Sequence, residues 1–403
     1  MSFVRAARSR LAGKKSLRPK VGAILAVMAV TSLAASLVSC GNGKLPPTGT
    51  GNTAYATVPS NGSVLVLHID GATGGINVEG STPQYAGTSP HGLALARSKK
   101  VLYVANSLSN DISTFNIASD GSLSLATTTS DGPRVSGPWE ALIDPTGQYL
   151  LVTNSGVPGT VSVFSIDSST GALGSVTGSP FEANDGPSEI VMPPAGNLVY
   201  VSNPSSGMVT GFIFDTTLAT CGTILCPVVG SPFYSGAGAS ALSFDNSGQF
   251  LYVANTSAEN VSPEVIGNIS AFGVNTTTGV LSHVSGSPFA PPIGTGPSTL
   301  VTVPNSPLLY ATTNGSSYSI WCFTIDSQTG LLMVAPDSPF SQTAGDLFAL
   351  IDTNGGYFFI GNNNSESPIA AYTFDSNTGE PTAVLNSPFS TAGEVPARMV
   401  IVP

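Results

Sequence analysis

Charged side chains and histidine are scarce in this chain of 403 residues. Asp, Glu, Lys and Arg together make up 9% of the sequence, and only three histidines occur. Multi-copper and haem centres need clustered ligands, so the sequence does not favour either class. Neither a Gly-rich phosphate-binding loop nor a Gly-x-Ser-x-Gly motif is present, which removes the usual signals of nucleotide binding and of α/β-hydrolase catalysis. We therefore expect no cofactor and no metal.

Basic residues are rare outside the N-terminus. Seven of the 13 Lys and Arg residues lie in the first 20 positions, whereas all 23 acidic residues follow Cys40. The part after Cys40 thus has six basic against 23 acidic residues, a formal charge of −17. Such a surface repels phosphate backbones, and we expect no nucleic-acid partner.

One long apolar run occurs, from Val21 to Val38, directly after the basic N-terminus. A basic segment, an apolar segment and small residues before a cleavage point are typical of a secretory signal. The run ends in Leu37-Val38-Ser39-Cys40, which resembles a bacterial lipobox, the motif in which the cysteine becomes the acylated first residue. An uncleaved transmembrane anchor is the alternative, because 18 apolar residues nearly span a bilayer.

The lipobox resemblance implies a domain order and a location. Residues 1–39 would form a signal peptide, Cys40 would carry lipid, and the Gly-rich stretch 41–53 would be a flexible tether. The protein would then be exported to the bacterial cell envelope, in the periplasm or at the outer membrane, with the membrane as a partner through the lipid anchor.

Besides Cys40 the chain has three cysteines. Cys221 and Cys226 lie five residues apart in an insertion, and they could close a small disulfide. A zinc site would need more ligands nearby, and no histidine occurs in that region. Cys322 lies in an apolar stretch and is predicted to be a buried thiol.

Glycine (45 residues) and proline (31) are abundant, which suits many short strands joined by tight turns. The chain repeats itself about every 50 residues. Each unit contains a segment such as Leu-Tyr-Val-Ala-Asn at 102–106 and 251–255, then an alternating apolar run, and most units end in Ser-Pro-Phe. Four short strands in each such unit are typical of one blade of a β-propeller.

The two ends of the repeat region give the number of blades. The first unit lacks its first strand and begins near Tyr55, whereas the chain ends in Val-Pro-Ala-Arg-Met-Val-Ile-Val-Pro, a first strand with nothing after it. If this last strand completes the first blade, the ring closes without free edges. We therefore predict an all-β fold, a seven-bladed β-propeller over residues 54–403 with four antiparallel strands per blade.

The repeats resemble those of the seven-bladed β-propeller lactonase family, the 6-phosphogluconolactonase-like group with Tyr-Val-Thr-Asn repeats. Leu-Leu-Val-Thr-Asn at 150–154 and the two Leu-Tyr-Val-Ala-Asn segments carry this resemblance, which covers about residues 55–403. It implies a site at one mouth of the central channel. The family often has histidine at the start of the first strand, whereas Glu140 and Glu189 stand there in this chain, and His91 is one position out of step.

Positions two residues after the motif proline should ring the channel mouth on the face where first strands begin, here called the top face. Glu140, Glu189 and Arg398 hold such positions, and His91 lies next to one, so these four are the candidate catalytic residues. Lactone opening needs a base for water and a positive group for the oxyanion. Glu140 or His91 could be the base and Arg398 the positive group. Alternatively, Glu189 and Arg398 only pair with each other, while Glu140 faces channel water.

Further residues are predicted to contact a ligand at the top face. Trp139 and Thr299 lie at the same strand starts, and a long connection after residue 255 brings Glu259 and Glu264.

Two functions remain open from the sequence. The first is an envelope propeller that binds a ligand or partner, such as a glycan or a protein, at its top face without catalysis. The second is a sugar lactonase that hydrolyses a small lactone.

Overall fold

The computed structural model describes residues 51–402, apart from 79–82, 97–99, 131, 133–135, 257–266, 290–295, 314–317, 343–344 and 353–355. The predicted signal peptide and Cys40 lie outside the described residues. Residues Pro47–Pro403 form one compact unit. Every regular element in the described ranges is a β-strand, and no helix there could cross a membrane.

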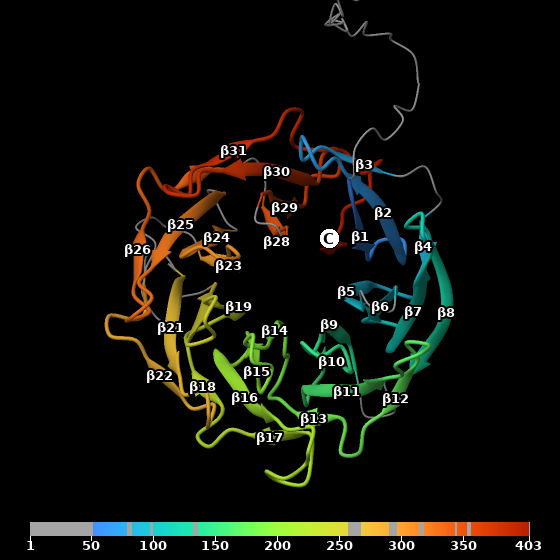
Figure 1. Ribbon diagram of the computed structural model, residues 1–403, viewed down its shortest axis with the longest axis vertical. Helices are drawn as coiled ribbons and strands as arrows, with labels where there is room; N and C mark the ends of the chain where they lie inside the picture. The colour runs from blue at the N-terminus through green and yellow to red at the C-terminus, as the bar shows by residue number, and fades with distance from the viewer. Residues whose placement is uncertain are drawn as a thin grey trace, which may run out of the picture. The chain divides into compact units, whose positions relative to one another are not determined.

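Seven antiparallel sheets are arranged in a ring around a central axis, as Figure 1 shows. This confirms the predicted seven-bladed β-propeller with four strands per blade. In blade order, the innermost strands are β32 (Arg398–Ile401), β5 (Pro90–Ala96), β9 (Pro138–Ile143), β14 (Ile190–Val191), β19 (Ala239–Phe244), β23 (Pro297–Thr302) and β28 (Asp346–Ile351). The second strands are β1 (Asn52–Val58), β6 (Val101–Asn106), β10 (Tyr149–Asn154), β15 (Leu198–Asn203), β20 (Phe250–Asn255), β24 (Leu308–Thr313) and β29 (Phe358–Asn362).

The third and fourth strands form the outer half of each blade, and six of the seven fourth strands have only three residues. The third strands are β2 (Ser63–Ile69), β7 (Asp111–Ile117), β11 (Thr160–Ile166), β16 (Met208–Phe214), β21 (Asn268–Val274), β25 (Ser319–Ile325) and β30 (Ile369–Phe374). The fourth strands are β3 (Ile76–Val78), β8 (Leu123–Ser130), β12 (Leu173–Ser175), β17 (Leu225–Pro227), β22 (Leu281–His283), β26 (Leu332–Val334) and β31 (Pro381–Ala383). Two-residue strands add to four blades: β4 (Gln84–Tyr85), β13 (Phe181–Glu182), β18 (Phe233–Tyr234) and β27 (Phe340–Ser341).

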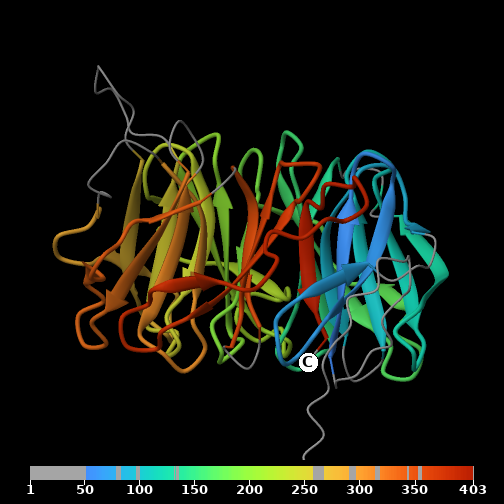
Figure 2. The same cartoon turned by 90° about the horizontal axis from the view of Figure 1, so that it is seen from above.

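The ring closes as the split first repeat predicts. The C-terminal strand β32 pairs with β1, with Tyr55 opposite Val400 and Thr57 opposite Arg398. Figures 1 and 2 show the red C-terminal strand beside the blue N-terminal ones. Strand β1 begins at Asn52, which pairs with Ile69. The predicted start of the propeller at residue 54 therefore falls inside β1.

The hydrophobic core lies between neighbouring blades. Strand β6 is buried along its whole length, because both of its faces pack on other blades. Its Tyr103 shares a core cluster with Leu150 and Val152 of the next blade. The Tyr103 hydroxyl also donates a hydrogen bond of 2.6 Å to the Gly171 carbonyl in a turn of that blade.

This tyrosine bond recurs around the ring. Five buried tyrosines on second strands donate to a glycine carbonyl of the following blade: Tyr55, Tyr103, Tyr200, Tyr252 and Tyr310. Half-buried Tyr357, just before β29, donates to the Gly71 carbonyl in the corresponding turn of the first blade. Each such bond contributes about 1 kcal/mol and fixes one blade against the next.

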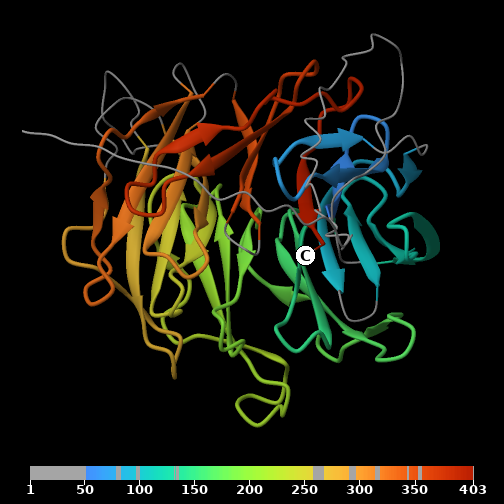
Figure 3. The same ribbon diagram turned by 45° about the horizontal axis from the view of Figure 1, so that its top comes forward.

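The junction between the third and fourth blades is the exception. Leu151 stands at the tyrosine position and packs in one cluster with Ile224 and Leu225. These two residues lie within the loop that the Cys221–Cys226 disulfide closes, as predicted. The yellow-green turn between β16 and β17 projects from the rim in Figures 1 and 3. An apolar contact thus replaces the hydrogen bond here. The free thiol of Cys322 is buried, also as predicted.

The Ser-Pro-Phe motif fastens the outer edge of most blades. In the third blade Phe181 pairs with Val161 of β11, and the Ser179 hydroxyl accepts a hydrogen bond from the Val163 amide. Equivalent bonds to Ser231, Ser287, Ser338 and Ser387 occur in four further blades. The motif therefore satisfies a strand amide at the point where the short fourth strand has ended.

Removing residues 396–403 should unfold the ring cooperatively or lower its stability by roughly 5 kcal/mol or more. The deletion removes the β1–β32 pairing and the buried side chains of Met399 and Ile401. Thermal and urea denaturation would measure the loss, with Pro396→Ala as the control in the same segment. A truncated protein with the wild-type midpoint would show that β32 does not stabilise the ring.

Candidate functional site

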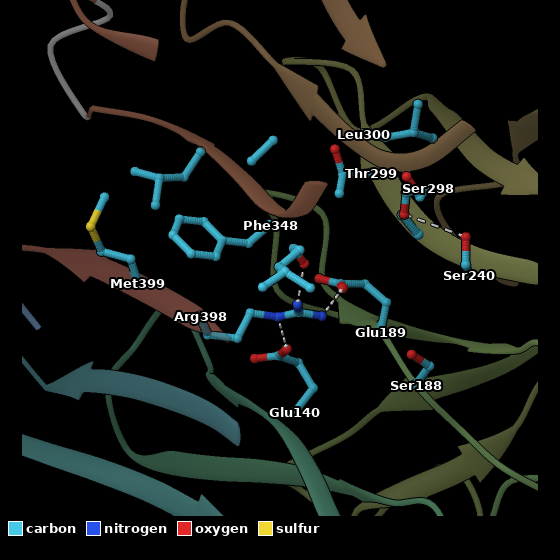
Figure 4. Close-up of a pocket in the computed structure, with 14 residues that line it drawn as sticks. Glu140, Ser188, Glu189, Ser240, Ser298, Thr299, Leu300, Phe348, Arg398 and Met399 are labelled. Carbon is cyan, nitrogen blue, oxygen red and sulfur yellow. Dashed lines mark hydrogen bonds and ion pairs between the residues drawn. The ribbon is translucent and has the colours of Figure 1, made fainter. Parts of the chain in front are cut away.

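A cavity of about 260 Å³ lies in the channel, and the innermost strands of six blades line it. Glu140, Glu189, Thr299 and Arg398 all contribute to its lining, as their positions two residues after the motif proline predict. Figure 4 shows their side chains around the cavity. The structure thus brings together three of the four candidate catalytic residues and one of the predicted ligand-binding residues.

A row of serines was missed by the sequence analysis. Ser188, Ser240 and Ser298 also line the cavity, although each lies one position before a residue that does so. The pairing of β23 with β24 explains this, because Pro297 faces Thr313 and Thr299 faces Thr312, which leaves Ser298 as an extra residue. Such a bulge turns two successive side chains towards one side of a strand. Regular alternation along a strand would instead place these serine side chains on the opposite face, away from the cavity.

Arg398 of the first blade contacts the third, fourth and seventh blades at the channel mouth. Its Nε donates to Glu140 Oε2 at 2.7 Å, and its Nη1 donates to the Leu347 carbonyl at 2.9 Å. Its Nη2 lies 3.6 Å from Glu189 Oε2, which is an ion pair beyond hydrogen-bond distance. Nη2 therefore keeps its N–H groups available to a ligand in the cavity. Figure 4 shows both ion pairs.

Glu140 is the closer and more buried of the two carboxylates. Its side chain is 10% exposed against 28% for Glu189, and its Oε1 accepts a further bond from the Ala141 amide. The alternative in which Glu189 and Arg398 pair only with each other, while Glu140 faces channel water, is therefore wrong, because Arg398 bonds to Glu140. Glu140 holds the guanidinium in place, whereas Glu189 remains the more accessible group.

Gly92 lies in β5 of the second blade, where the backbone closely approaches that of β9. It lies two residues after the motif proline Pro90, and its blade stands between the first and third blades, which the Arg398–Glu140 ion pair joins. A Cβ at Gly92 would lie 2.5 Å from the Trp139 carbonyl oxygen and 2.6 Å from the Glu140 Cα. The lack of a side chain at Gly92 lets β5 approach β9 closely.

The charges in the cavity shift the titration of Glu189. Partial burial and then repulsion by Glu140 raise the pKa of Glu189 to about 7, and attraction by Arg398 only partly opposes this. Burial alone would lower the pKa of Arg398, but Glu140 and Glu189 outweigh it and raise the pKa. The site therefore combines a permanent cation with a carboxyl group that titrates near neutral pH.

His91 and Trp139 lie outside the cavity lining. Their rings stack on each other with centroids 3.6 Å apart. Burial and then the charge of Arg398 lower the pKa of His91 to about 3, against a hydrogen bond with the Trp139 backbone that raises it. The imidazole is therefore neutral at physiological pH and a weak base, so it fits packing better than proton transfer.

Two of the predicted ligand-binding residues cannot be placed, since Glu259 and Glu264 lie outside the described residues. Within the part of the chain that the structure describes, no three His, Cys, Asp or Glu side chains gather to hold a metal ion.

We expect Gly92→Ala to destabilise the protein by about 1–3 kcal/mol. The new methyl group must push apart the backbones of β5 and β9, which are in direct contact at this point. Urea denaturation would measure the change. Gly273→Ala is a matched control on another strand, because its Cβ would meet only Ser282 at an ordinary 3.5 Å, and it should stay within about 0.5 kcal/mol of wild type. Equal stability of the two variants would contradict the close approach.

Comparisons with known proteins agree with this architecture. The model of the family described as "Lactonase, 7-bladed beta-propeller" matches residues 47–333. A putative 6-phosphogluconolactonase from Bacteroides uniformis is 18% identical with a TM-score of 0.69, over 87% of this chain and 99% of that one. The periplasmic gluconolactonase of Pseudomonas aeruginosa is 17% identical with a TM-score of 0.71, over 88% and 99%. No curated protein sequence matches the chain. At these identities the structural likeness concerns the fold.

Proposed function

Because the chain belongs to the lactonase family of seven-bladed β-propellers, we propose that it hydrolyses a neutral sugar lactone in the channel cavity. The observation that carries this proposal is the pairing of Arg398 Nη2 with Glu189 in one cavity. One group can stabilise a developing oxyanion, and the other can accept a proton near neutral pH. The gluconolactonase names of two structural neighbours support a sugar lactone as the substrate class.

Glu189 acts as the general base in the proposed reaction. Its carboxylate takes a proton from water while the water oxygen attacks the lactone carbonyl carbon. The carbonyl oxygen becomes an oxyanion, which accepts a hydrogen bond from Arg398 Nη2. The oxyanion then re-forms the carbonyl as the ring C–O bond breaks, and the departing ring oxygen accepts from Glu189 the proton that came from water. Glu140 does not touch the reacting atoms in this scheme, and it positions the guanidinium through Nε.

The charge of the cavity favours a neutral substrate. Glu140 and Glu189 outnumber Arg398, and the other basic residue in the described ranges is exposed Lys100, in the turn between β5 and β6 at the far end of its blade. A substrate phosphate would meet repulsion from the two carboxylates, and among the described residues Arg398 is the one cation that lines the cavity. The cavity volume of about 260 Å³ also suits a ligand smaller than the drug-sized molecules that fill sites of about 300–1,000 Å³.

Glu189→Gln and Arg398→Met should each lower the rate of lactone hydrolysis by about 10²- to 10⁴-fold, since each removes a group needed in the transition state. The assay uses D-glucono-δ-lactone and 6-phosphogluconolactone, with spontaneous hydrolysis subtracted, and the neutral lactone should react faster. Glu182→Gln, at an exposed position of β13, is the matched control. Full activity in both site variants would place the site elsewhere. Wild-type rates equal to buffer on both substrates would favour a propeller that binds its ligand without catalysis.

The pH profile should identify Glu189 as the base. A general base works when ionised, and its pKa is raised to about 7, so kcat/KM should fall as the pH drops below about 7, well above the usual range of a glutamate. Glu140→Gln removes one cause of that raised pKa and should shift the acidic limb of the profile to lower pH. A limb that stays in place in this variant would contradict the assignment.

We further propose that the protein is exported and anchored by lipid at Cys40. The basic N-terminus, the apolar run 21–38 and the Leu-Val-Ser-Cys sequence support this. The periplasmic location of the Pseudomonas aeruginosa gluconolactonase, a structural neighbour, supports export.

Cys40→Ser should release the protein from the membrane fraction, because the acylated thiol is lost. Mass spectrometry of the wild-type protein should find Cys40 as a lipid-modified N-terminus. Unchanged membrane retention of the variant, or an intact segment 1–39 in the wild type, would exclude the lipid anchor.

A further inference from the structure

A buried carboxylate lies behind the cavity wall and takes no part in the proposed reaction. Asp346 begins β28 at the position where five other blades have the motif proline, and its residue is only 3% exposed. Its Oδ2 accepts hydrogen bonds of 2.7 Å from Ser298 Oγ and from Thr312 Oγ1. Its Oδ1 is buried and has no hydrogen-bond partner among the described residues. A polar group that is costly to bury has therefore been placed beside the site.

The carboxylate fixes the direction of the hydrogen bonds around it. A hydroxyl has one proton to donate, whereas an ionised carboxylate only accepts. Thr312 gives its proton to Asp346, and the hydroxyls of Thr312 and Thr299 are bonded to each other. The proton of this second bond must therefore come from Thr299. As a result, Thr299 faces the cavity with lone pairs and without a proton to donate.

The same reasoning applies to the neighbouring serines of the cavity wall. Ser298 gives its proton to Asp346, so its oxygen can only accept from a ligand. The proton of Ser240 points to backbone carbonyls, those of Ala254 and Ser298. Figure 4 shows Ser240, Ser298 and Thr299 together on one part of the cavity wall, with Arg398 and the two glutamates on another. The Arg398 side of the cavity thus offers an N–H donor, whereas the side formed by Ser298 and Thr299 offers hydroxyl acceptors.

We infer that Asp346 is a positioning residue that makes Thr299 and Ser298 acceptors for a hydroxyl group of the ligand. Thr299 is then a specificity-determining residue, which distinguishes a lactone ring with a hydroxyl group facing Thr299 from a ring without one. A site built to bond a ligand hydroxyl binds the analogue without it less well, because a buried acceptor is left without a donor. This inference rests on the proposed function for the identity of the ligand ring.

The test compares two lactones of the same ring size, hydroxylated D-glucono-δ-lactone and unsubstituted δ-valerolactone. In Thr299→Val the ratio of their kcat/KM values should fall by about threefold to tenfold, the worth of one neutral hydrogen bond. Thr312→Val should lower the ratio similarly, although Thr312 is fully buried and does not line the cavity. Thr312→Ser keeps the hydroxyl and should restore the ratio. Thr382→Val, on exposed β31, is the control.

A structural role alone would give a different pattern. If Thr312→Val only loosens the fold, both lactones should lose kcat/KM equally and the ratio should stay constant, which would overturn the inference. A ratio unchanged in Thr299→Val would overturn it as well. Thermal midpoints of all variants show whether the fold itself is affected.

Binding of stable ring analogues separates this inference from the proposed hydrolysis. D-Gluconolactam and δ-valerolactam keep the two rings and resist opening, and calorimetry measures their affinity. If neither lactone is hydrolysed but wild type prefers gluconolactam and Thr299→Val loses about threefold to tenfold of that preference, hydrolysis fails and the inference stands. If wild type shows no preference for gluconolactam, the inference is wrong whether or not hydrolysis occurs.

Discussion

The ion pair between Arg398 and Glu140 links the closure of the ring to the chemistry of its channel. Arg398 is the first residue of β32, the strand that completes the first blade, and it stands opposite Thr57 of β1. Its guanidinium bonds to Glu140 of the third blade. The chain ends must therefore meet before the positive group of the site exists. A ring that failed to close would lose both its last strand and its cation.

Placing three charged groups in one cavity has an energetic cost. Two carboxylates share one guanidinium, and removal from water disfavours each charge. Glu140 offsets part of this cost through the Arg398 Nε bond and the Ala141 amide. Burial and then repulsion by Glu140 raise the pKa of Glu189, and its longer contact with Arg398 offsets these two effects only in part. The arrangement that disfavours the ionised form of Glu189 also makes its carboxylate a base suited to neutral pH.

The repeat carries most of the information on the fold. The split unit at Tyr55 and at the C-terminus predicts seven blades, because only a shared blade leaves the ring without edges. The proline spacing predicts that Glu140, Glu189, Thr299 and Arg398 face one cavity. Other features depend on contacts between blades that no single repeat contains. The bulge at Ser298, the close approach of β5 to β9 at Gly92 and the bonds of Asp346 each need the neighbouring strand in place. The stacking of His91 on Trp139 likewise joins two blades.

The central claim is that Arg398 and Glu189 act as one unit on the same bound lactone. A double-mutant cycle in kcat/KM for D-glucono-δ-lactone tests it most directly, with Glu189→Gln, Arg398→Met and the double variant measured above spontaneous hydrolysis. Groups that act together are strongly non-additive, so the double variant should be about as slow as the slower single variant. Independent effects that multiply in the double variant would contradict the account.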